Sequence, residues 1–319
     1  MKRMNAARKS AKSSDFEPGD ARMTFSPARI GLAVPGLTLT GGTHCAWEAS
    51  ATIDDMAMVA RAADRLGYSH LQCAEHVGVP AAEAPRRGAR YYDPLATFGY
   101  FSAITSQIRF LTAVLVLGYH HPLQIAKRYG TLDVVSGGRL ILGLGVGSLK
   151  EEFDLLGLGG TEFKERGARG DDALKALRAS LGQRDPEYHG PYYDFSGMTI
   201  DPCAVQKDLP LWIGGRSARS LRRAVELGDG WMPFGLDYDQ MAAFLSAARE
   251  LPSWDARSKP LEIVLRPPGM VDPLGQPGEA AEAIRKLLAV GATRADLHIL
   301  SHSGAHFVEQ LEALADLDC

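Results

Sequence analysis

A glutamate and a histidine stand side by side at Glu75-His76, directly after a predicted strand, residues 68–74. Histidine titrates near neutral pH and is the usual proton-transfer group, and a neighbouring carboxylate can assist it. The alternative is a polar loop pair with no chemistry. Because the pair ends a predicted strand, we favour a catalytic role for His76, with Glu75 as its acidic companion.

Two glycine-rich segments also follow predicted strands. The first is at residues 143–148 and the second is at residues 214–220. Glycine lets a ligand approach the backbone closely, and backbone N–H groups at a helix N-terminus bind anions such as phosphate. In the second segment Arg216 adds charge and Ser217 adds a hydroxyl, although Ser217 could equally be an ordinary helix cap. The first segment lacks the GxGxxG spacing of a dinucleotide fingerprint. The residues that we assign to ligand binding are Gly145, Gly147, Ser148, Gly214, Gly215, Arg216 and Ser217.

Metal binding is a weaker hypothesis. Glu75, His76, His120, His121 and His302 all follow predicted strands, but no DxH or HxH pair marks a metal site, so we expect none. A glycosidase with two carboxylates is also disfavoured, because Glu75 alone among the acids ends a strand. We expect His120 and His121, which precede a helix-starting proline, to line the rim of the site or to cap that helix.

The elements that must position these residues alternate between strand and helix. The eight expected strands are residues 30–34, 68–74, 110–117, 140–144, 209–213, 229–232, 261–265 and 295–300. A helical pattern follows each one, and a hairpin is expected at 188–194. Eight such units indicate a (β/α)8 TIM barrel with insertions after strand 4, an α/β fold that typically takes about 250 residues. Alternation alone does not exclude a doubly wound open sheet.

Length, charge and composition limit the possible partners, the location and the domain organisation of the protein. The chain has 319 residues and a formal net charge of −3, which argues against nucleic acid as a partner. No apolar run reaches the roughly 20 residues of a membrane helix. Four scattered cysteines indicate free thiols in a reducing cytoplasm. Residues 1–27 are expected to be a disordered tail and residues 28–319 a single barrel domain.

Six segments together resemble one family, the bacterial luciferase-like flavin and deazaflavin oxidoreductases. They are residues 73–80 (CAEHVGVP), 121–127 (HPLQIAK), 131–139 (TLDVVSGGR), 143–147 (GLGVG), 210–215 (PLWIGG) and 228–231 (GDGW). The resemblance spans residue 29 to the C-terminus. It implies a TIM barrel with an insertion, a homodimer, and a flavin-type cofactor at the C-terminal mouth of the barrel.

The sequence is most similar to the branch that uses the deazaflavin coenzyme F-420. The resemblance implies that His76 lies near the deazaflavin ring and that a non-proline cis peptide at about Ala113-Val114 supports the ring. It also implies that the segment from Gly145 to Ser148 approaches the cofactor and that Gly214-Gly215 holds its phosphate. Sugar-phosphate dehydrogenases of this branch carry a glutamate acid after strand four, a place that falls here on Ser148 or its neighbours.

We therefore expect hydride transfer between coenzyme F-420 and a small organic substrate of unknown identity. The first alternative is an FMN-dependent monooxygenase that uses oxygen and takes reduced flavin from a separate reductase. The second alternative is a flavin-binding protein without catalytic activity, which the intact Glu75-His76 pair argues against.

Overall fold

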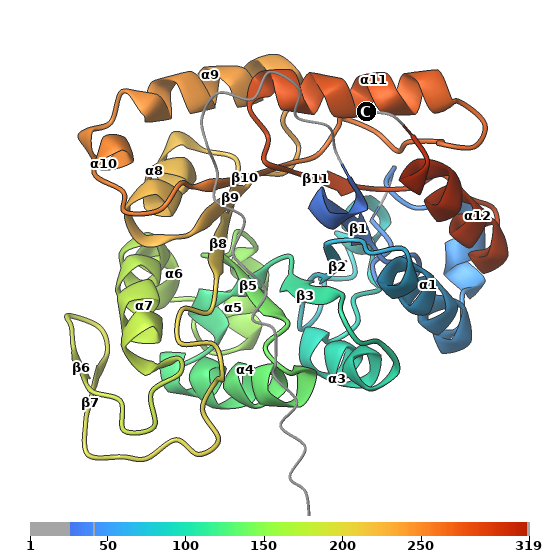
Figure 1. Ribbon diagram of the computed structural model, residues 1–319. Coiled ribbons are helices and arrows are strands. Elements are labelled where there is room, and N and C mark those ends of the chain that lie inside the picture. Colours follow the sequence, from blue (N-terminus) through green and yellow to red (C-terminus); the bar gives the residue numbers. More distant parts are fainter. Residues whose placement is uncertain (1–25, 41, 318–319) are drawn as a thin grey trace, which may run out of the picture.

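The computed structural model describes residues 26–40 and 42–317, so all but two residues of the predicted tail lie outside the described residues. The strands form one closed parallel barrel ringed by helices (Figure 1). They are β1 (Ile30–Ala33), β2 (His70–Cys73), β3 (Arg109–Thr112), β4 (Leu115–Val116), β5 (Leu140–Gly145), β8 (Leu211–Gly214), β9 (Gly230–Met232), β10 (Glu262–Leu265) and β11 (Arg294–Leu297). The expected TIM barrel is confirmed.

Pairing between neighbouring strands closes the barrel. The order is β3-β2-β1-β11-β10-β9-β8-β5, and a further pairing of β3 with β5 joins the two ends. The predicted strand 110–117 is wrong in one respect, because it is two strands, β3 and β4. The break falls at a cis peptide bond between Ala113 and Val114, the position that the family resemblance implies.

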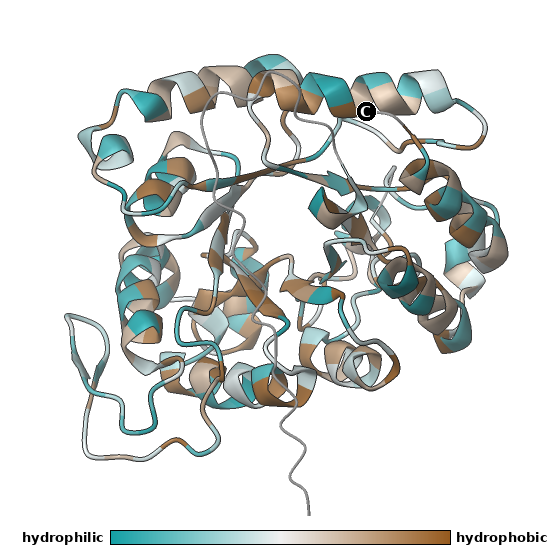
Figure 2. Ribbon diagram, viewed as in Figure 1, coloured by the Kyte–Doolittle hydropathy of each residue, from teal (hydrophilic) through white to brown (hydrophobic). Residues whose placement is uncertain are grey.

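The helices cover the outer faces of the strands. The longer ones are α1 (Ile53–Arg65), α3 (Pro94–Ile104), α4 (Pro122–Ser136), α7 (Arg166–Ser180), α8 (Ala218–Leu227), α9 (Tyr238–Arg249), α11 (Pro277–Val290) and α12 (Gly304–Ala315). The shorter ones are α2 (Ala84–Arg87), α5 (Lys150–Leu155), α6 (Thr161–Lys164), α10 (Pro252–Asp255) and the 3-10 turns η1 (Pro27–Arg29), η2 (Ala46–Ser50) and η3 (Leu117–Tyr119). Apolar and polar residues are interspersed along α1 and α11 (Figure 2), and the buried residues of α1 recur every three to four positions, as in an amphipathic helix.

The region after β5 departs most from a plain barrel. The helical segment that follows α5 is divided into α6 and α7, which meet at Glu165. The predicted hairpin is present as β6 (Tyr188–His189) and β7 (Asp194–Phe195), an antiparallel pair. It projects from the lower left of the barrel in Figure 1. The expected insertion after the fourth barrel strand is therefore confirmed.

The inside of the barrel holds both apolar and polar side chains. Leu111, Ile141, Trp212, Met232 and Val264 form an apolar cluster there. Side chains on a strand alternate between its two faces, so residues two positions apart share a face.

A buried polar pair lies beside this cluster, with the His70 ring 5.4 Å from the Trp212 ring between centroids. His70 Nε2 and Asp296 Oδ1 are 2.8 Å apart. A Cβ atom at Gly31 would stand 2.0 Å from His70 Nε2 and 2.5 Å from the Asp296 carboxylate. Only a residue without a side chain fits β1 at that point.

We predict that Gly31→Ala lowers the free energy of unfolding by about 2–3 kcal/mol, because the added methyl must displace the buried His70–Asp296 pair. Gly99→Ala is the matched control. It lies inside α3, where an added Cβ meets nothing within 4 Å, and it should stabilise the chain by up to about 1 kcal/mol. Urea unfolding of both variants measures the difference, and equal stabilities would contradict the packing argument.

Candidate active site

A buried glutamate, Glu152 of α5, accepts hydrogen bonds from two of the loops at the C-terminal ends of the first barrel strands. Its Oε2 accepts a 2.8 Å hydrogen bond from His76 Nδ1 and a 2.6 Å bond from the Tyr119 hydroxyl. Its Oε1 accepts the backbone N–H of Val77 at 2.5 Å and that of Gly78 at 3.3 Å. One carboxylate thus joins α5, the loop after β2 and the turn η3.

The electrostatics of this cluster favour an ionised Glu152. Burial raises the pKa of the Glu152 carboxyl, but the hydrogen bonds from His76 and Tyr119, the charge of His76 and the Val77 N–H together outweigh burial. The net pKa of Glu152 is therefore below its ordinary value. Burial and the adjacent carboxylate both raise the pKa of the Tyr119 phenol, so Tyr119 is a neutral hydrogen-bond donor.

The position of His76 follows from these contacts. A carboxylate can only accept a hydrogen bond, so Nδ1 of His76 must carry the hydrogen that Glu152 accepts. The edge of the imidazole packs on the Tyr91 ring at 4.4 Å between centroids. The side chain is 22% exposed, whereas that of Glu152 is fully buried. Its Nε2 is left available for a ligand at the mouth of the barrel.

Glu75 has a different environment from its neighbour. One carboxylate oxygen lies 2.7 Å from His120 Nε2, and the other accepts the Val116 N–H at 2.7 Å. Both oxygens are engaged, so Glu75 ties the end of β2 to β4 and to the segment that follows it. His121 accepts the Leu123 N–H and caps α4, one of the two roles expected for the histidine pair.

Three of the predicted cofactor residues meet at the ends of β4, β5 and β8. A Cβ atom at Gly145 would lie 2.6 Å from the Val114 side chain, and one at Gly214 would lie 2.5 Å from it. Val114 therefore packs between two strands that have no side chains there. Gly147 has a φ of +78°, and an added Cβ would stand 2.6 Å from the Phe153 ring. Ala113 precedes Val114 across the cis bond.

The second predicted glycine segment starts α8. Ser217 accepts the Ser220 N–H and caps the helix, which is the structural alternative considered for this residue. Gly215 has a φ of +125°, and the Arg216 guanidinium lies 5.6 Å from the centre of the Phe234 ring. Binding of phosphate at this segment stays a prediction.

Two polar residues of the site were not identified from the sequence. Glu152 lies only four residues after Ser148, the position compared with the family's glutamate, but Lys150-Glu-Glu looks like the exposed start of a polar helix. Ser148 itself is exposed. Tyr119 follows the third predicted strand, but nothing in the sequence marks it as a site residue. The available signal was the presence of acids directly after the fourth strand.

A pocket of about 240 Å³ adjoins this cluster. The lining residues are Gly118, Tyr119, His120, His121, Phe153, Leu158, Glu162, Arg166, Arg169 and Tyr193. Two of them are arginines from the start of α7, and Arg166 also donates from Nε to the Gly147 carbonyl at 3.2 Å. The pocket therefore brings positive charge next to the glycine segment that follows β5.

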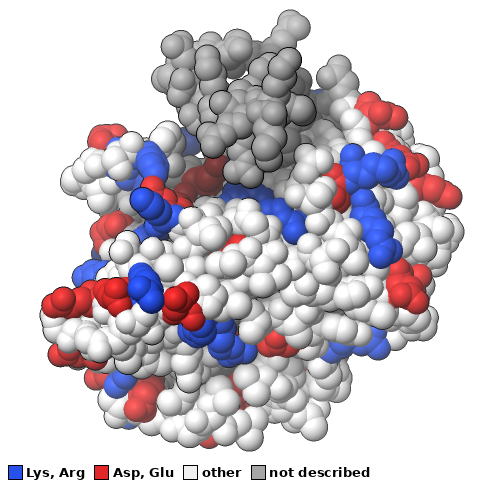
Figure 3. All heavy atoms as spheres, turned by 60° about the horizontal axis from the view of Figure 1, so that its bottom comes forward, with Lys and Arg blue, Asp and Glu red and all other residues white. Residues whose placement is uncertain are grey.

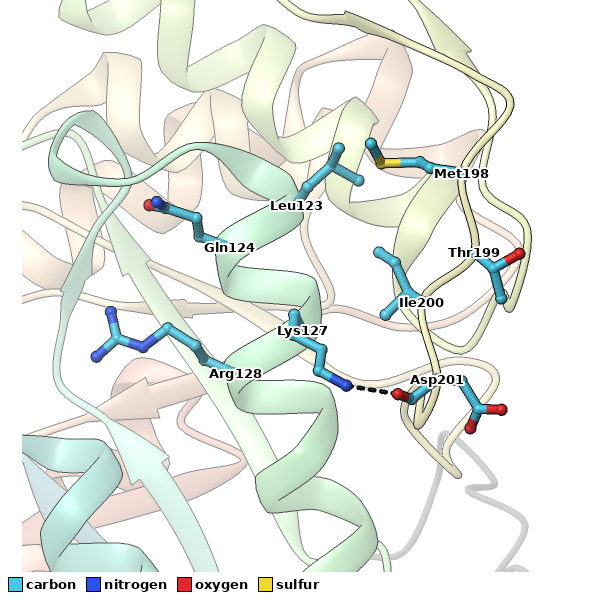
Figure 4. Close-up of a pocket in the computed structure, with 8 residues that line it drawn as sticks. All are labelled: Leu123, Gln124, Lys127, Arg128, Met198, Thr199, Ile200 and Asp201. Atoms are coloured by element: carbon cyan, nitrogen blue, oxygen red, sulfur yellow. Dashed lines mark hydrogen bonds between the residues drawn. The ribbon is translucent and has the colours of Figure 1, made fainter.

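A second hollow, of about 430 Å³, lies outside the barrel (Figure 4). Leu123 and Lys127 of α4 point toward the segment 198–201, and Lys127 Nζ donates to the Asp201 carbonyl at 2.6 Å. Gln124 and Arg128 of α4 also line the hollow. None of the residues discussed above as site residues lines it.

Over residues 26–40 and 42–317, no group of three or more His, Cys, Asp or Glu is arranged to hold a metal ion. Within the same ranges no helix is long and apolar enough to cross a membrane. Basic and acidic side chains are interspersed over the face seen in Figure 3. Cys45, Cys73 and Cys203 are free thiols, and Cys319 lies outside the described residues.

We predict that Glu152→Gln lowers the free energy of unfolding by about 2–3 kcal/mol at neutral pH, since it replaces a charged acceptor of several hydrogen bonds. The folded-state pKa of Glu152 is depressed, so its stabilisation is present above the ordinary pKa of about 4.3 and is lost as the pH falls through the folded value. The difference between wild type and variant should therefore shrink below about pH 4. Denaturant unfolding between pH 3 and 7 measures it.

Glu151→Gln is the control, because that neighbouring side chain is exposed. Its effect should be small at every pH. A stability difference for Glu152→Gln that does not change with pH would contradict the assignment of an ionised carboxylate.

Comparison with curated proteins finds relatives of modest similarity. An uncharacterized protein of Mycobacterium tuberculosis is 27% identical over 217 residues, which cover 64% of this chain and 74% of the relative. The oxygenase component of the flavin-dependent trigonelline monooxygenase of Acinetobacter baylyi is 26% identical over 176 residues, 55% of this chain and 46% of that protein.

Solved structures share the fold at low sequence identity. Monooxygenase RslO1 from Streptomyces bottropensis superimposes with a TM-score of 0.72 at 20% identity, covering 91% of this chain and 98% of the other. The coenzyme F-420 dependent tetrahydromethanopterin reductase from Methanopyrus kandleri has a TM-score of 0.63 at 15% identity, with the same coverage.

A third structure was solved with FMN. The oxygenating constituent of 3,6-diketocamphane monooxygenase from Pseudomonas putida has a TM-score of 0.64 at 13% identity, covering 91% of this chain and 97% of the other. The family described as luciferase-like monooxygenase matches residues 34–315. This chain, with its closed barrel and its cluster at the ends of the first strands, belongs to the luciferase-like monooxygenase family.

Proposed function

We propose that the protein is an oxidoreductase that transfers a hydride between the deazaflavin coenzyme F-420 and a small organic substrate. The observation that carries the proposal is the position of His76. It stands at the C-terminal end of β2, held through Nδ1 by a buried carboxylate, with Nε2 left for a ligand. The C-terminal ends of the strands are the working face of such barrels.

The residues present fit a flat cofactor with an anionic tail. At Gly145 and Gly214 only the Val114 side chain fills the space between the strands, which makes a smooth wall next to the cis peptide. Arg166 and Arg169 line the adjoining pocket and offer positive charge to an anionic group. Ala113, Gly147, Ser148 and the segment from Gly214 to Ser217 complete the proposed cofactor-binding set.

The residues of the chain would share the work as follows. A bound deazaflavin supplies the hydride donor or acceptor, chemistry that side chains do not provide. His76 exchanges a proton with the substrate through Nε2. Glu152 orients the ring and stabilises its protonated form, and Tyr119 holds Glu152 in place. Glu75, engaged on both oxygens, positions the end of β2 rather than exchanging protons.

The second candidate is an FMN-dependent monooxygenase. The similarity to the flavin-dependent trigonelline monooxygenase component favours it. In that case a separate reductase would supply reduced flavin. A homodimer and a cytoplasmic location are further expectations from the family resemblance and the free cysteines.

We expect coenzyme F-420 to bind the purified full-length chain more tightly than FMN. The two cofactors are titrated separately while their fluorescence is followed. Tight binding of FMN with no binding of the deazaflavin would replace the first proposal with the second. Binding of neither would oppose both.

We expect His76→Ala to reduce turnover by roughly 10²–10⁴-fold while the cofactor dissociation constant changes little, because the variant removes a proton-transfer group. His189→Ala is the matched control, since that histidine is exposed on the projecting hairpin. Steady-state kinetics and cofactor titration give the two quantities. Unchanged turnover of His76→Ala would remove His76 from the mechanism.

A further inference from the structure

Three buried polar atoms on the inner wall of the barrel have no hydrogen-bond partner among the described residues. They are Gln72 Nε2, Arg266 Nε and His298 Nε2. Their residues belong to three strands or strand ends, since Gln72 lies in β2, Arg266 follows β10 and His298 follows β11. Buried polar groups in proteins are nearly always paired, so three unpaired atoms in one region need a cause.

Strand alternation places these side chains inside the barrel. Val264 belongs to the interior apolar cluster, and Arg266 is two residues further along the same strand direction. In the same way Gln72 lies two residues after His70, and His298 lies two residues after Asp296. His70 and Asp296 are the two members of the interior pair. All three therefore form the inward layer nearest the C-terminal ends of the strands. Gln72 is only three residues before Glu75.

Arg266 carries a charge without a carboxylate partner. Its one hydrogen bond goes from an Nη atom to Gln72 Oε1 at 2.9 Å, and over residues 26–40 and 42–317 it makes no salt bridge. The charge of Asp296 acts on Arg266 without a direct contact, and that carboxylate is bonded to His70. By contrast, Arg294 at the other end of the barrel is paired with Glu262 at 3.3 Å. Arg266 is only partly buried as a residue, but its Nε atom is buried without a partner. A cation that is shielded from water without an anion is costly, so a ligand that supplies the anion would be favoured.

His298 adds an acceptor to this layer. Burial, assisted by the charge of Arg266, lowers the pKa of His298 to about 3, so the ring is neutral. Its Nδ1 lies 3.1 Å from the Thr43 carbonyl and must carry the ring hydrogen, because a carbonyl only accepts. Nε2 is then an unprotonated acceptor. The layer as a whole offers donors from Arg266 and Gln72 and one acceptor from His298.

We propose that Arg266 and Gln72 form a substrate subsite that binds the carboxylate of a small organic acid, with His298 accepting a hydrogen bond from a hydroxyl or N–H of the same molecule. The inference rests on the proposed function, since it places the rest of the substrate toward His76 at the mouth. The donor set is what a carboxylate requires: a guanidinium N–H and an amide N–H that are dry and fixed. The substrate class is therefore anionic rather than neutral or cationic.

The test uses the full chain without cofactor and measures binding of acetate, benzoate and lactate by calorimetry at constant ionic strength. Acetamide and benzamide serve as neutral counterparts of equal shape, and chloride as a simple anion. We expect at least one carboxylate to bind and the amides and chloride not to bind. Arg266→Met should weaken carboxylate binding by roughly 10–100-fold, and Arg266→Lys, which keeps the charge but loses the fork, by less.

Arg222→Met is the matched control, because that arginine is exposed on α8, and it should bind carboxylates as the wild type does. The proposal is overturned if no carboxylate binds the wild-type chain, if chloride binds equally well, or if Arg266→Met and Arg266→Lys bind with unchanged affinity. Should Arg266→Met fail to fold, Arg266→Lys alone decides.

Cofactor titration of Arg266→Met separates this inference from the proposed function. Retained cofactor binding with lost carboxylate binding supports the subsite. If the wild-type chain binds neither cofactor but binds carboxylates through Arg266, the subsite stands and the proposed reaction fails.

Discussion

A buried carboxylate needs several hydrogen-bond donors to remain charged. The loops at the C-terminal ends of the first barrel strands are organised around that requirement. Glu152 obtains its donors from the loop after β2 and from η3, segments that no regular sheet or helix hydrogen bond holds together. Because Glu152 accepts a hydrogen bond from His76 Nδ1, it also fixes the tautomer and orientation of His76. A second carboxylate, Glu75, holds the neighbouring turn in place through its contacts with the Val116 N–H and His120 Nε2. The two acids divide the work, one directing the histidine and the other holding the backbone.

The fold was predictable because its signals are local. Apolar runs of strand length, helix caps such as Asp93 before Pro94, and glycines after helices all act within a few residues. The same logic predicted that His76 stands at a strand end, where it does lie, just after β2. The Ala113-Val114 bond came from the family resemblance and not from the apolar run, which looks continuous.

What could not be predicted depends on distant pairs. Glu152 is 76 residues from His76, and nothing in Lys150-Glu-Glu distinguishes the buried acid from its exposed neighbour Glu151. Whether α5 turns one glutamate inward depends on how Phe153 packs beside Gly118 and Gly147. Arg266 is similar, because an arginine before two prolines looks like a loop residue. Arg266 lies inside the barrel because it is two residues after Val264 of β10, whose side chain faces inward.

The contact of Val114 with Gly145 and Gly214 has a consequence for how this family can vary. Three strand ends share the volume of one valine side chain, so the sizes of these residues are coupled rather than independent. A methyl gained at either glycine would have to be matched by methyls lost at position 114, and a change to alanine or serine there would open room on both sides. Sequences that diverge at this wall should therefore change in pairs, and redesign of the proposed cofactor site should treat the three positions as a single unit of volume.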